Sequence, residues 1–173
     1  MIIEKTFGEK LAAVLRQILP TGIALVSAVF MGTQTRVPGL ASVLPDLPLI
    51  VVYYWSVVRP QSLGAGSAFA IGILQDLVTG LPLGLSAMAL VATRIVIARQ
   101  SRFFIGKSFW VYWWGYAVVV LAVGLGQWLL ALVVLGLKAP ILQVLAAAVL
   151  GFGVFPLVYW LCDRIERHVL AED

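Results

Sequence analysis

Residues 63–97 read LGAGSAFAIGILQDLVTGLPLGLSAMALVATRIVI and decide the fold. Two apolar runs follow each other with only residues 79–82 between them. Each run approaches the length of about 20 apolar residues that a bilayer-spanning helix needs. Glycine and proline between such runs mark a turn. The stretch therefore predicts two membrane-spanning helices, over 63–79 and 82–97, joined as a tight hairpin.

The rest of the chain repeats this pattern of apolar runs between short polar segments. Hydrophobic residues make up 62% of the sequence and charged residues 12%, which excludes an ordinary soluble domain. Apolar runs such as 116–125 do not alternate with polar residues, so helices are favoured over the strands of a membrane barrel. We expect an all-α integral membrane protein, a six-transmembrane-helix bundle that forms a single domain over residues 1–173. The predicted spans are residues 18–32, 43–58, 63–79, 82–97, 110–135 and 141–161.

The second predicted span has an irregular start. Too few residues lie between Pro48 and Arg59 to cross a bilayer, so the span must begin upstream and pass through Asp46. Irregular backbone at membrane depth is tolerated only where protein buries it. Aromatic residues followed by a base are typical of a membrane interface, and we therefore expect Tyr54, Trp55 and Arg59 to anchor the depth of this span.

Basic residues are distributed unequally between the two sides of the predicted membrane. With six spans, ten Lys and Arg residues share the side of both termini, and only Arg36 and Lys138 lie opposite. Because cytoplasmic loops are rich in Lys and Arg, both termini should be cytoplasmic, as should the basic loop over 94–108. Apolar residues at helical spacing up to Ile18 predict that this part of the chain lies along the membrane surface. The scattered bases do not form the basic face of a nucleic-acid-binding protein.

Asp76 is the first candidate functional residue, because it is the only acid deep inside an apolar hairpin. A carboxylate at mid-bilayer costs about 2.5–3.5 kcal/mol. Asp76 lies 12 residues after Gly64, or roughly 18 Å along the helix, which places it in the outer half of the membrane. Arg59 and Arg94 lie near the inner face, so neither is expected to pair with it. Its carboxylate either closes the hairpin by hydrogen bonds or contacts a substrate or partner directly.

Small residues form a stripe on the first helix of the hairpin and continue into its turn. They recur at steps of four residues, which keeps them on one helix face, and they allow helices to approach closely. Two interpretations remain open for this stripe, packing within the chain and contact with a helix of another chain. The residues concerned are Gly64, Ala68, Gly72, Asp76, Gly80 and Gly84.

No group of residues points to catalysis. Cys162 is the only cysteine and His168 the only histidine, so a Cys/His metal cluster cannot form. Gly106, Lys107 and Ser108 lack the upstream glycine of a phosphate-binding loop. We expect a protein that is not an enzyme and that has no cofactor and no metal.

The segment from Tyr54 to Gly84 resembles the signature of the bacterial rod-shape-determining protein MreD family. It holds the pair Tyr54-Trp55, then Arg59-Pro60, and then a Gly-x-x-x-Asp-x-x-x-Gly-x-x-x-Gly pattern formed by Gly72, Asp76, Gly80 and Gly84. Length, hydropathy and predicted cytoplasmic ends are similar to the family over the whole chain.

This resemblance implies a non-enzymatic scaffold in the bacterial inner membrane that helps to maintain rod shape and organises peptidoglycan synthesis. Its implied partners are MreC, a single-span protein, and through it the MreB filament, RodA and the transpeptidase of RodA. The chain also resembles the substrate-binding S components of energy-coupling-factor vitamin transporters, in which Asp76 would contact a ligand. A third alternative is a generic membrane anchor or chaperone.

Overall fold

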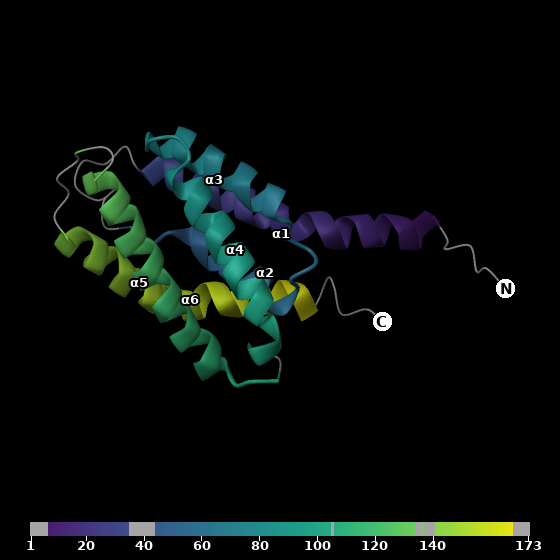
Figure 1. The fold of residues 1–173 in the computed structure, drawn as a ribbon. Coiled ribbons are helices and arrows are strands. Elements are labelled where there is room, and N and C mark those ends of the chain that lie inside the picture. Colours follow the sequence, from purple (N-terminus) through teal and green to yellow (C-terminus); the bar gives the residue numbers. More distant parts are fainter. Residues whose placement is uncertain (1–6, 35–43, 105, 134–135, 137–140, 168–173) are drawn as a thin grey trace.

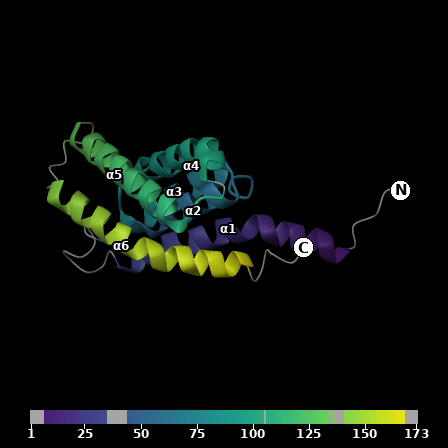
Figure 2. The ribbon, with the colours of Figure 1, turned by 90° about the horizontal axis from the view of Figure 1, so that it is seen from below.

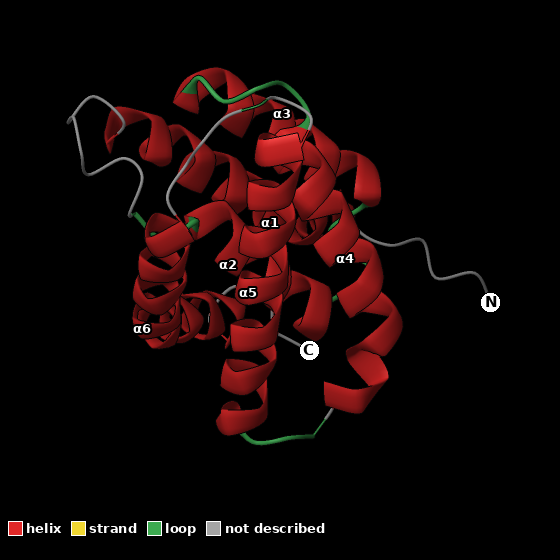
Figure 3. Cartoon of the chain, turned by 60° about the vertical axis from the view of Figure 1, so that its left-hand side comes forward, coloured by secondary structure: helices red, strands yellow, loops and turns green. Residues whose placement is uncertain are grey.

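The computed structural model describes residues 7–34, 44–104, 106–133, 136 and 141–167. These residues form six helices and no strand, which confirms the all-α prediction (Figure 3). The helices are α1 (Phe7–Gln34), α2 (Leu47–Val58), α3 (Ala65–Thr79), α4 (Leu85–Phe104), α5 (Phe109–Val133) and α6 (Ile141–Ile165).

Helix α2 is the centre of the bundle. Ten of its 12 residues are buried, and it packs against all five other helices. Successive helices run in opposite directions, so α1 begins and α6 ends at the same end of the bundle (Figures 1 and 2). We call this the basic end, because α2 ends there just before Arg59, α4 ends there beyond Arg99, and α5 begins there after Lys107. The opposite end, where α3 turns into α4, is the hairpin end.

Helix α2 begins later than the predicted span 43–58. Asp46 is its N-cap, and the Asp46 carboxylate accepts a hydrogen bond of 3.1 Å from the backbone N–H of Leu49. Pro48 lies in the first turn, where its missing N–H costs nothing. The helical part of the predicted span therefore begins at Leu47, and residues 44–46 before it are not helical.

Two further helix limits differ from the predicted ones. Helix α1 is continuous over 28 residues and passes through Pro20, so there is no separate helix before the first predicted span. Helix α4 continues through much of the expected loop over 94–108 and ends at Phe104. The charges in that segment suggested a loop. Among its described residues, a backbone conformation that favours glycine over a helical residue occurs only at Gly106, where φ is 73°.

Buried aromatic rings join α2 to α5 and α6. Tyr53 contacts Tyr116 and Phe155 edge-on, with ring centroids 5.6 and 5.9 Å apart. Tyr116 and Phe155 stack at 4.7 Å. Trp55 is fully buried as well. The expectation that Tyr54 and Trp55 anchor the protein at a lipid interface is therefore wrong, because both side chains point into the protein core.

The outward faces of α5 and α6 are apolar. By length and composition these two helices could cross a membrane, and shorter apolar helical stretches cover Ile18–Gly32, Leu47–Val58 and Ala65–Thr79. Water would be a poor solvent for these faces, whereas lipid suits them. A continuous row of exposed apolar side chains on α5 contains Trp114, Val118, Leu121, Leu125 and Leu129.

Candidate functional site

The candidate site is the hairpin of α3 and α4, and Asp76 joins its two helices. The side chain of Asp76 is fully buried. Its Oδ2 accepts a hydrogen bond of 2.8 Å from the backbone N–H of Gly84, and its Oδ1 accepts one of 3.0 Å from the N–H of Ser86. These N–H groups belong to the start of α4, which has no intrahelical acceptor for them. Asp76 on α3 therefore caps α4, as expected for a carboxylate that closes the hairpin.

Glycines shape the turn between the two helices. Gly80 ends α3 in the left-handed region with φ 72°, and Gly84 has φ 97° just before α4. Side chains with a Cβ rarely adopt these angles. The backbone carbonyl of Asp76 accepts the N–H groups of Gly80 and Leu81, so both the main chain and the side chain of Asp76 hold the turn.

The small-residue stripe packs against the same chain. A Cβ added to Gly72 would lie 2.2 Å from the Cα of Ala87 on α4, which only glycine avoids. Ala68 is fully buried. Gly64, by contrast, is exposed at the N-cap of α3. Internal packing is thus the interpretation that the structure shows for Ala68, Gly72 and Asp76.

A second polar contact ties the hairpin to the start of α2. Gln75 is buried, and its Nε2 donates a hydrogen bond of 3.1 Å to Oδ1 of Asp46, the N-cap of α2. The adjacent Thr79 hydroxyl donates to the backbone carbonyl of Gln75 at 2.7 Å. At the hairpin end, two neighbouring residues of α3 therefore fix the starts of both α2 and α4.

Different polar contacts hold the basic end. Oε1 of Glu166, just after α6, lies 3.1 Å from Nε of Arg59, and its Oε2 accepts a hydrogen bond of 2.9 Å from the hydroxyl of Tyr54. The guanidinium of Arg94 donates to the carbonyls of Pro60 and Leu63 in the connection from α2 to α3. Arg59 and Arg94 thus bind a carboxylate and backbone carbonyls at the basic end. The carboxylate of Asp76 binds backbone amides at the hairpin end.

Some of these contacts were not predicted from the sequence. The N-cap role of Asp46 could have been found, because an acid before a proline is a known start signal. The hydrogen bond from Gln75 to Asp46 joins residues 29 positions apart, and the ion pair of Glu166 with Arg59 joins residues 107 positions apart. Sequence periodicity does not indicate such distant pairs. Within the described ranges, no three His, Cys, Asp or Glu residues gather as a metal site requires.

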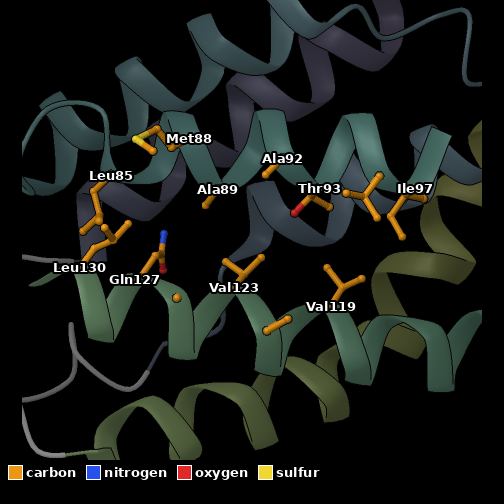
Figure 4. Close-up of a pocket in the computed structure, with 13 residues that line it drawn as sticks. Leu85, Met88, Ala89, Ala92, Thr93, Ile97, Val119, Val123, Gln127 and Leu130 are labelled. Carbon is orange, nitrogen blue, oxygen red and sulfur yellow. The ribbon is translucent and has the colours of Figure 1, made fainter. Parts of the chain in front are cut away.

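A groove separates α4 from α5 (Figure 4). Its volume is about 330 Å³, and apolar and small side chains form most of its walls. Two polar side chains reach it, Thr93 from α4 and Gln127 from α5. The Thr93 side chain is 5% exposed, and its hydroxyl has no hydrogen-bond partner.

Polar groups that face inward at the helix ends, together with apolar outward faces, define a helical membrane protein. Among known families, the model of the rod shape-determining protein MreD matches residues 12–164. The chain therefore belongs to the MreD family. The Rod shape-determining protein MreD of Haemophilus influenzae is 27% identical over 133 residues, which cover 76% of this chain and 80% of that protein.

A second relative is similar over a shorter region. An uncharacterized protein of Rickettsia prowazekii is 28% identical over 67 residues. The aligned part covers 39% of this chain and 38% of the Rickettsia protein. No solved structure matches the chain at a significant level.

Proposed function

We propose that the protein is a non-enzymatic scaffold of the rod complex in the bacterial inner membrane, where it binds MreC and through it supports MreB, RodA and its transpeptidase. Membership of the MreD family supports a role in rod-shape determination. The observation that favours a scaffold is the state of Asp76. Both of its carboxylate oxygens are occupied by backbone amides of α4, so the residue acts in building the bundle.

The same contacts disfavour the vitamin-transporter alternative. A pocket for a water-soluble ligand needs several converging polar groups. In the described residues, the groove between α4 and α5 offers only Thr93 and Gln127 among apolar walls. Asp76, which would contact the ligand in that alternative, is fully buried and already bonded to Gly84 and Ser86.

The proposed topology has six membrane crossings with both termini in the cytoplasm. The alternating helix directions support it, because α1 begins where α6 ends (Figure 1). The described basic residues lie toward that same end, as the positive-inside rule requires of a cytoplasmic side. Single cysteines placed in a Cys162→Ser background test the topology. An impermeant thiol reagent added outside cells should label position 81 and spare position 100, and the reverse pattern would overturn the orientation.

The proposed function is tested in a rod-shaped bacterium that is depleted of its own MreD-family protein. The test asks whether this chain restores cell shape and whether MreC copurifies with it. The tagged full chain should restore rods and retain MreC after mild detergent extraction. An unrelated six-span protein carrying the same tag, at equal membrane level, is the control. Round cells and no retained MreC, with the chain folded and present at normal level, would contradict the scaffold proposal. The host should be a close relative, so that a mismatch with a foreign MreC does not decide the result.

A further inference from the structure

The groove between α4 and α5 is unlike the other contacts of α4. Small residues line both of its walls, with Ala89 and Ala92 on α4 and Ala122 and Gly126 on α5. Small residues usually let two helices approach closely. Here the two helices stay apart (Figure 4), and the groove between them is partly open to the surface. An elongated apolar group fits such a space.

Thr93 marks a polar point midway along this groove. Its hydroxyl points toward α5 in Figure 4 and has no hydrogen-bond partner, although the side chain is more than nine-tenths buried. A buried hydroxyl without a partner is unfavourable, because it has lost its hydrogen bonds to water. A ligand in the groove that carries an acceptor oxygen at this depth would remove that cost.

The face of α4 that lines the groove continues beyond it to cations at the basic end. Ala89, Val96 and Phe103 recur every seven residues on α4, so they share one face of the helix. Phe103 is 67% exposed, and the Lys107 ammonium lies 5.9 Å from the centroid of its ring. Arg99 is exposed one turn beyond Val96. An apolar groove with two exposed cations beyond one of its ends is complementary to an anionic amphiphile.

We propose that this groove binds one anionic phospholipid. An acyl chain lies between α4 and α5, and the phosphate meets Arg99 and Lys107. The ester carbonyl accepts a hydrogen bond from Thr93, which lies six residues, or about 9 Å, from Arg99 along the helix. Charge complementarity favours a lipid over a transmembrane helix, since a helix would place apolar side chains against these cations. The site lies between α4 and α5, apart from the contact of α4 with α3, and does not depend on MreC.

Lipid retention by the purified protein tests the charge. Native mass spectrometry compares phosphatidylglycerol with phosphatidylcholine of identical acyl chains. Each cation near an anionic headgroup contributes about fivefold in affinity, so phosphatidylglycerol should bind the more tightly. The double variant Arg99→Gln/Lys107→Gln should bind both lipids equally. The matched control Arg102→Gln/Arg164→Gln also removes two exposed charges and should keep the preference. Equal retention of both lipids by the unaltered protein, or equal loss in both double variants, would overturn the proposal.

Thr93→Val tests the depth of the lipid. Removal of the hydroxyl should lower the binding affinity for both lipids by the same factor, about fivefold for one hydrogen bond. The preference for phosphatidylglycerol should stay. Unchanged retention of both lipids would contradict the predicted contact of Thr93 with the ester.

A photoreactive residue at position 92, introduced into the full chain in cells, identifies the occupant. The adduct at this position should have the mass of a phospholipid and should be richer in anionic headgroups than the adduct at position 118, which faces outward on α5. A protein adduct at position 92 would show that a helix fills the groove instead. Equal headgroup composition at both positions would indicate bulk lipid and overturn a specific site.

Discussion

Helix α4 presents two faces that contrast sharply. Toward α3 it is closed: Gly72 brings the two backbones together at Ala87, and Asp76 accepts two amides of the helix start. Toward α5 it is open: a groove separates the helices, and the Thr93 hydroxyl in it is unpaired. Small residues line both faces. They produce close packing only where polar groups and a short turn hold the helices together, so composition alone does not decide whether a helix face is closed.

The largest effect is expected from Asp76→Leu, which breaks the closed face. Two buried amides lose their acceptor, at about 1–3 kcal/mol for each. Asp76→Asn should lose an intermediate amount of stability. The side-chain oxygen of Asn can still accept from one backbone N–H, but its NH₂ group would face the other N–H, and two donors cannot bond each other. Thermal unfolding of both variants in one detergent measures the order, and equal stability of Asn and Leu would contradict it.

Gly72→Ala should be the next most harmful change. The new Cβ would lie 2.2 Å from a backbone atom that cannot rotate away, so α3 and α4 must separate, at a cost of about 3 kcal/mol. Gly66→Ala is the matched control, because it lies on the same helix with no atom within 4 Å of a new Cβ. The two variants are compared by folded yield and unfolding midpoint. Similar values for both would contradict a close backbone contact between Gly72 and Ala87.

Smaller effects are expected at the basic end, where solvent reaches the polar contacts. Glu166→Gln weakens a partly exposed ion pair with Arg59, which should contribute about 1 kcal/mol or less. A double-mutant cycle with Tyr54→Phe isolates the hydrogen bond between Tyr54 and Glu166. Additive losses in that cycle would show that the two side chains do not interact in solution.

The smallest effect is expected from Thr93→Val on the open face. In lipid-free detergent the hydroxyl has no partner to lose, so the unfolding free energy should stay within about 1 kcal/mol or rise slightly. A loss as large as that of Gly72→Ala would mean that Thr93 is bonded inside the protein, and that the two faces of α4 do not differ in the way described.

The sequence predicted the hairpin well because its signals are local. Apolar runs, the turn glycines and the lone Asp76 all lie within residues 63–97, and the hydrogen bonds that they form span at most ten positions. The exposed apolar faces of α5 and α6 likewise follow from composition.

Other features depend on contacts between distant residues and were not predictable in this way. The aromatic run around Trp55 was interpreted as an interface anchor, because sequence cannot show that five helices surround α2. The charges after Arg94 suggested a loop, although carbonyls of the α2–α3 connection satisfy its guanidinium and the helix continues. Glu166 gave no signal, since its partners Tyr54 and Arg59 lie more than 100 positions away.

The amount of MreC retained per folded molecule of the Asp76→Asn variant tests the central claim most directly. If Asp76 acts only by closing the hairpin, fewer molecules fold, but each folded molecule should retain as much MreC as the unaltered protein does. Folded molecules are counted by fluorescence-detected size exclusion, and MreC is quantified in the same fractions. A normal amount of folded protein that retains no MreC would contradict the account, because it would place the charge of Asp76 in partner binding.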